Sequence, residues 1–122
     1  MQAAKILSFA SLVEVGTGLA LIIAPRLVVG LLLGGELAAE SVPLGRVAGV
    51  ALLALGRACW PGGQPTARDS PALRGMLTYN VLVALYLIYL GAVAHQGGVL
   101  LWPAVVLHAV VALLLIRSSS ST

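Results

Sequence analysis

Charged side chains are scarce in this sequence, which has seven basic and four acidic residues among 122, or 9%. A soluble protein carries roughly 25% charged residues, so this chain has too little charge to cover a water-soluble domain of its size. Hydrophobic residues make up 60%, enough for four bilayer-spanning helices of roughly 20 residues each. The composition therefore excludes a soluble enzyme, a nucleic-acid-binding protein and a disordered tail.

The sequence also has a single cysteine and lacks the common catalytic motifs. The one cysteine, Cys59, permits no internal disulfide. The sequence has no CxxC, HExxH, nucleophile-elbow, P-loop or dinucleotide-binding motif. His95, His108, Cys59 and Glu14 lack the spacing of metal ligands. We therefore expect no metal site, identify no cofactor from the residues, and favour a non-enzymatic role over a catalytic one.

Long apolar runs are what the sequence has in abundance. They cover residues 4–24, 42–60, 74–94 and 100–116, and each is near the length that crosses a bilayer as a helix. We predict an all-α, integral membrane four-helix bundle that forms a single domain over residues 1–122. The shorter run 27–34 lies between Pro25 and the Gly34-Gly35 pair. It predicts a short interfacial or re-entrant helix, the alternative being a first helix that continues through a kink at Pro25.

The basic residues predict the orientation of the bundle. Four spans place most of them on one side, namely Lys5, Arg57, Arg68, Arg74 and Arg117, against Arg26 and Arg46 on the other. Because basic residues favour the cytoplasmic side, we expect a multi-pass protein of the inner cell membrane with both termini in the cytoplasm. The lipid bilayer is the expected partner. A small amphipathic ligand and a homodimer or larger membrane complex remain open, and no nucleic acid is expected.

Each predicted span carries a polar side chain that lipid would penalise unless it faces the bundle or water. They are Glu14, Arg46, Asn80 and His108. Small residues lie three or four positions from each of them, which is typical of a helix face that packs against another helix. We therefore expect all four to face inward as a ligand-binding or proton-relay site, lined by Ser11, Thr17, Tyr79 and Tyr86.

The depths of these residues predict their contacts. At 1.5 Å per residue, Glu14 and His108 both lie near mid-membrane. We expect a buried Glu14–His108 contact, with Arg46 reaching inward to Glu14 and Asn80 completing the network. A purely structural network that fixes helix register is the alternative interpretation.

Several short motifs resemble those of small four-helix bacterial membrane proteins of the DoxX-like superfamily, many of them uncharacterised. They are Pro25 with the Leu-Leu-Leu-Gly turn at 31–34, Gly45-Arg46 through Ala54-Leu55-Gly56, Tyr79-Asn80, and Leu101-Trp102-Pro103 through Leu107-His108. The resemblance implies a four-helix bundle and a link to quinone-associated redox systems. It favours a protein whose polar site binds a small polar or amphipathic ligand, such as a quinone or a lipid head group, or relays protons.

A second resemblance supports an alternative function. Val13-Glu14-Val15-Gly16-Thr17 is similar to the first span of the small multidrug resistance transporters, which have four spans and an essential glutamate. This resemblance implies a proton-coupled small-molecule exporter. The long loop at 61–73, Arg46 and His108 depart from that family. A structural accessory subunit of a membrane complex is the third hypothesis.

Overall fold

Helices account for the regular structure of residues 2–120, the part of the chain that the computed structural model describes. In chain order they are α1 (Gln2–Ile23), α2 (Pro25–Leu33), the 3-10 helix η1 (Ala39–Ser41), α3 (Val42–Cys59), α4 (Pro71–Ala92) and α5 (Leu101–Ser120). Four helical segments are long and apolar enough to cross a membrane: α1, α3 together with the preceding η1, α4 and α5. The predicted all-α membrane bundle is confirmed, and the protein is a multi-pass membrane protein.

Proline, glycine and serine set the helix boundaries. α1 ends at Ile23 and α2 begins at Pro25, so the short segment is a separate helix and not a kinked continuation of α1. Gly34, which ends α2, has a φ of 77°, a left-handed conformation that glycine adopts without strain. α4 begins three residues earlier than predicted because the Ser70 hydroxyl accepts a hydrogen bond from Leu73 N (3.2 Å), an N-cap followed by proline.

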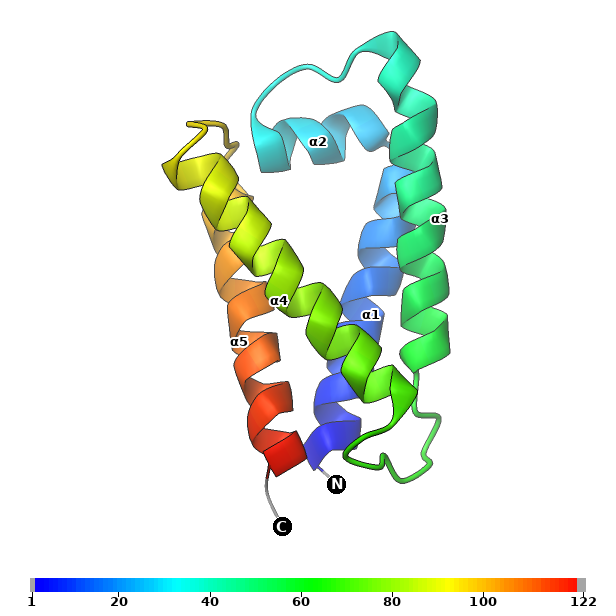
Figure 1. Ribbon diagram of the computed structural model, residues 1–122. Helices are drawn as coiled ribbons and strands as arrows, with labels where there is room; N and C mark the ends of the chain where they lie inside the picture. The colour runs from blue at the N-terminus through cyan, green and yellow to red at the C-terminus, as the bar shows by residue number, and fades with distance from the viewer. Residues whose placement is uncertain (1, 121–122) are drawn as a thin grey trace.

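The long helices form two close pairs, α1 with α3 and α4 with α5 (Figure 1). The chain termini and the loop between α3 and α4 lie at one end of the molecule, which we call the terminal end. From there the two pairs diverge, and α2 lies across the opposite end. The placement of both termini and this loop on one side agrees with four consecutive crossings.

Glycine allows α1 and α3 to approach until their backbones touch. A Cβ added to Gly18 would lie 2.6 Å from Gly49 O, and one added to Gly49 would lie 2.6 Å from Gly18 O. One added to Gly56 would lie 2.7 Å from Ser11 O. Small residues that permit such contact are the usual basis of helix association in membranes. Gly49 lies three residues from Arg46, so one of the small residues that predicted a packing face on α3 is at the contact with α1.

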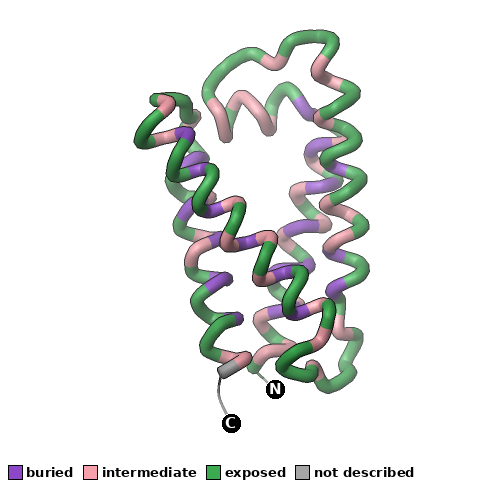
Figure 2. Tube along the Cα trace, in the orientation of Figure 1, coloured by how far each residue is buried: buried purple, intermediate pink, exposed green. Residues whose placement is uncertain are grey.

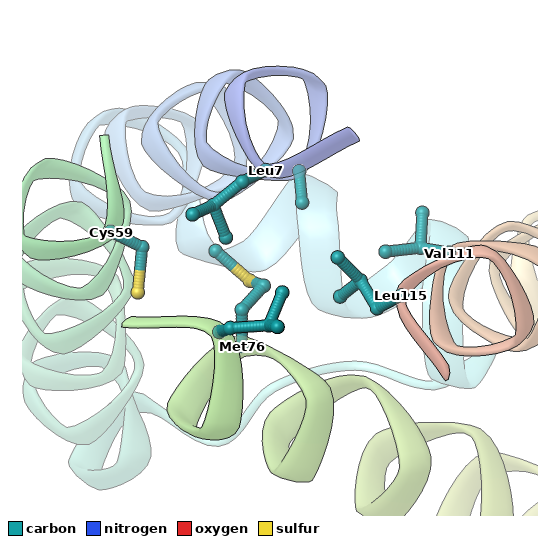
Figure 3. Close-up of a cluster of buried hydrophobic side chains, with 7 residues drawn as sticks. Leu7, Cys59, Met76, Val111 and Leu115 are labelled. Carbon is teal, nitrogen blue, oxygen red and sulfur yellow. The ribbon is translucent and has the colours of Figure 1, made fainter. Parts of the chain in front are cut away.

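All four long helices meet in a compact apolar cluster near the terminal end. Figure 3 shows its side chains pointing toward one another across the bundle. Its buried members are Leu7, Ala10, Cys59, Leu73, Met76, Val111 and Leu115. This cluster joins the two helix pairs. It fixes the positions of the residues that lie one or two helical turns farther from the terminal end.

A second apolar cluster lies toward the opposite end, between α4 and α5. Its buried members are Leu87, Leu90, Leu101 and Val105, and Leu32 and Leu33 of α2 pack against it. The loop after α4 also donates two backbone hydrogen bonds to α2, from Gly98 N to Leu32 O (3.0 Å) and from Leu100 N to Leu31 O (2.8 Å). These bonds satisfy carbonyl groups that a helix C-terminus leaves unpaired. α2 is thereby attached to the α4–α5 pair.

The outward faces of the long helices are apolar. Leu82, Leu85, Val106 and Leu113 each expose about 60% of their surface, and Figure 2 shows exposed positions along the outside of every long helix. Exposed leucine and valine in this number suit contact with lipid acyl chains.

Candidate functional site

A layer of polar side chains lies between the two apolar clusters. Glu14 of α1 and Asn80 of α4 are each 1% exposed, and His108 of α5 is 9% exposed. Along α1, Glu14 follows Leu7 and Ala10, which belong to the apolar cluster near the terminal end. That cluster therefore separates the polar side chains from the terminal end of the molecule. Together with Tyr79, these residues make up what we call the polar layer.

The best defined contact in the polar layer joins α4 to α5. Asn80 Nδ2 donates to Met76 O, one turn earlier in α4, at 2.8 Å. This bond orients the amide so that Oδ1 faces Nδ1 of His108, at 2.7 Å. Because an amide oxygen only accepts hydrogen bonds, we assign the imidazole hydrogen to Nδ1. A neutral His108 then carries its lone pair on Nε2.

Tyr79 connects α1 to this pair. Its hydroxyl lies beside the Glu14 carboxyl and interacts with it. Its ring lies edge-on to the His108 ring, with 5.8 Å between the centroids and an interplanar angle of 79°, a favourable aromatic arrangement. Glu14 and His108, predicted to touch directly, share no hydrogen bond within residues 2–120. The tyrosine contacts both of them.

The layer contains hydrogen-bond acceptors and a carboxyl group but no fixed positive charge. Within residues 2–120, no lysine or arginine pairs with Glu14, whose polar partner is Tyr79. An ionisable side chain at membrane depth is costly unless its charge is balanced. A proton or a positively charged or hydrogen-bond-donating group could supply that balance.

The His108 ring has one nitrogen without a hydrogen bond. Nδ1 is bonded to Asn80, and no other hydrogen bond forms to this ring in the described part of the chain. The 9% of His108 that remains exposed compares with 1% for Glu14 and Asn80. Nε2 of His108 is therefore unbonded and can accept a hydrogen bond from a further group.

Arg46 is not part of this layer, and the expectation that it reaches Glu14 is wrong. The side chain is exposed, and its Nε donates to Ile22 O at 3.1 Å. Ile22 lies in the last turn of α1, where carbonyl groups lack helical partners and attract basic side chains. It also lies eight residues from Glu14, or about 12 Å along the helix axis. The Arg46 guanidinium therefore bonds to the nearby Ile22 carbonyl and not to Glu14.

Two of the expected lining residues lie apart from the layer. Tyr86 is 61% exposed, and its ring stacks on Tyr89 with centroids 6.1 Å apart. It shares a face of α4 with Tyr79 but lies two turns nearer the end at which the two helix pairs have diverged (Figure 1). Thr17 is half-buried and makes no hydrogen bond to the four residues of the layer.

The remaining two lining residues are Ser11, which is buried, and Tyr79, which is half-buried. Ser11 is fully buried at the contact between α1 and α3. Tyr79 has a larger role than the sequence indicated, since it links Glu14 to His108. Its position next to Asn80 in the sequence was the one indication that Tyr79 could contact the same site. Neighbouring residues on a helix point about 100° apart, so one can face α1 while the other faces α5.

Neither a metal site nor a known relative assigns a function to the polar layer. Within residues 2–120, no three histidine, cysteine, aspartate or glutamate side chains lie close enough to share a metal ion. No protein-family model, curated protein or solved structure matches the chain.

Proposed function

We propose that the polar layer binds the polar head of a small amphipathic molecule, a quinone or a lipid head group, or relays protons beside it. The observation that carries this proposal is the free Nε2 of His108, held in place by the bond between Nδ1 and Asn80. A fixed ring with an unbonded acceptor nitrogen in a buried layer is suited to receive a hydrogen bond.

The chemistry of the layer narrows the kind of head group. Nε2 of a neutral His108 accepts hydrogen bonds, and so does an ionised Glu14. A head group that donates through hydroxyls, such as a reduced quinone or the glycerol of a lipid, complements both. The same two groups can hold a proton, with the Tyr79 hydroxyl adjacent to the carboxyl. Ligand binding and proton relay therefore use one site.

A proton-coupled exporter is the second candidate, and one observation favours it. Glu14 is buried and has no cationic partner in residues 2–120, so a cationic substrate and a proton could compete for it. The resemblances to DoxX-like proteins and to small multidrug resistance transporters remain predictions, and the accessory-subunit hypothesis is tested by the same experiment.

The experiment extracts the protein from its native membrane in a polymer that retains bound lipid and identifies co-purifying small molecules by mass spectrometry. The wild type is expected to carry a quinone or one lipid species near one per chain. His108→Leu and Glu14→Gln are expected to lower this content about tenfold, the effect of losing one hydrogen bond to a polar head. Added decylubiquinol serves as a defined probe for the same site.

The control variant is Tyr86→Phe, which alters an exposed ring outside the layer and should leave the content unchanged. A folded His108→Leu protein with the wild-type content would contradict the proposal and favour an accessory role. Accumulation of a cationic dye in vesicles, driven by a proton gradient and abolished by Glu14→Gln, would instead favour the exporter.

A further inference from the structure

A second binding feature lies outside the polar layer, on the surface formed by α1 and α3 near the terminal end. A groove of about 360 Å³ runs there between the two helices. It is lined by Ser11, Leu12 and Val15 of α1, by Gly56 and Arg57 of α3, and by Trp60. We call it the α1–α3 groove.

The floor of the groove holds an unsatisfied polar atom. Ser11 is 0% exposed, and its Oγ has no hydrogen-bond partner. Ser8, one turn earlier, bonds its hydroxyl to Ala4 O at 2.8 Å. Buried hydroxyls are normally hydrogen-bonded, and an unpaired one costs about 1–3 kcal/mol. A ligand in the groove that offers an acceptor to Ser11 would remove that cost.

The mouth of the groove carries a cation and an indole ring. Arg57 lies in the last turn of α3, and its exposed guanidinium has no hydrogen bond or ion pair within residues 2–120. Trp60, 49% exposed, follows directly after α3. Tryptophan and arginine together at a helix end are typical of the level of lipid head groups. Leu12 and Val15 continue the groove as an apolar surface toward the bilayer centre.

Charge at the terminal end favours an anionic occupant. Five basic residues and one acidic residue, Asp69, lie at this end of the fold; the basic ones are Lys5, Arg57, Arg68, Arg74 and Arg117. At the other end, the two basic residues Arg26 and Arg46 are equal in number to the acidic residues Glu36 and Glu40. Basic residues near the membrane surface attract anionic lipids by about 1 kcal/mol each. A second copy of the chain fits less well, because a symmetric contact here would bring like charges together.

We propose that the α1–α3 groove binds one anionic phospholipid, with its phosphate at Arg57, an ester or glycerol oxygen at the Ser11 hydroxyl, and an acyl chain along Leu12 and Val15. The site is distinct from the polar layer, since it opens at the surface between α1 and α3 and uses none of the four residues of that layer. The expected ligand is a membrane lipid and not free phosphate.

The test is native mass spectrometry of the purified protein with equimolar phosphatidylglycerol and phosphatidylcholine. The wild type is expected to retain one phosphatidylglycerol in preference to phosphatidylcholine. Arg57→Gln should lower this retention about tenfold, as expected for a lost charge-assisted hydrogen bond, and Ser11→Ala about fivefold. Arg57→Lys keeps the charge and should retain most of the binding, which separates a lost contact from a lost fold.

The matched control is Arg74→Gln, which removes an exposed charge from the same end of the molecule but from α4. Its retention of phosphatidylglycerol should match the wild type. Equal loss in Arg57→Gln and Arg74→Gln, equal retention of the two lipids, or displacement by excess inorganic phosphate would overturn the proposal. A dimer that dissociates in Arg57→Gln would assign the groove to a second copy instead.

Discussion

Gly49→Ala is expected to lower the free energy of unfolding by about 1–3 kcal/mol, the usual cost of overpacking a close contact. The added Cβ would lie 2.6 Å from Gly18 O and 2.9 Å from Leu21 Cβ. A backbone oxygen cannot move aside as a flexible side chain can, so α1 and α3 must separate. Unfolding in mixed detergent micelles, followed by circular dichroism, measures the change.

Gly16→Ala is the matched control, because a Cβ at Gly16 meets nothing within 4 Å. Replacing glycine by alanine at an exposed helical position stabilises a helix by about 0.5–1 kcal/mol. The two substitutions add the same methyl group and should have opposite signs. Equal effects would contradict the glycine-mediated contact between α1 and α3.

Asn80→Leu and His108→Leu are each expected to lower the free energy of unfolding by about 1–2 kcal/mol, because each leaves a buried polar atom of its partner unpaired. Asn80→Leu leaves Nδ1 of His108 without its acceptor, and His108→Leu leaves Oδ1 of Asn80 without its donor. The double variant leaves neither atom unpaired and should recover much of the loss. A double-mutant cycle measures this coupling.

Thr78→Leu provides the control for this cycle, since Thr78 is an exposed residue of the same helix. It should change stability by no more than about 0.5 kcal/mol. Strictly additive effects of Asn80→Leu and His108→Leu would show that the two side chains do not interact in the folded protein.

The membrane fold could be predicted almost completely from the sequence. Apolar runs near 20 residues define the long helices because lipid offers no hydrogen-bond partner to an open backbone. Pro25 and Gly34 set the bounds of α2, and only the ends of the spans moved, as at Ser70. The spacing of small residues indicated a packing face around Gly49, but not that α1 would be the helix that meets it.

The candidate site could be predicted only in part. The burial of Glu14, Asn80 and His108 followed from the small residues around them. The position of Arg46 did not, because its long guanidinium side chain bonds to a nearby acceptor on another helix, Ile22 O. Such competition depends on the end of a neighbouring helix, which periodicity within one helix does not reveal.

Tyr79 and Tyr86 illustrate the same limit. They are seven residues apart and so lie on nearly the same face of α4. One lies beside Glu14 and His108, whereas the other is exposed. The difference arises from the divergence of the two helix pairs (Figure 1), a tertiary property that helical periodicity cannot encode.

The most direct test of the polar layer is nitrogen NMR of ¹⁵N-histidine-labelled protein in bilayers. The chain has two histidines, so a His95→Gln background leaves His108 as the reporter. At mildly alkaline pH, where imidazole is neutral, the hydrogen is expected on Nδ1 with Nε2 unprotonated. The resonances should shift in Asn80→Leu and in Tyr79→Leu, and also in Glu14→Gln through the tyrosine. A hydrogen on Nε2, with resonances indifferent to all three substitutions, would contradict the meeting of α1, α4 and α5 at one polar site.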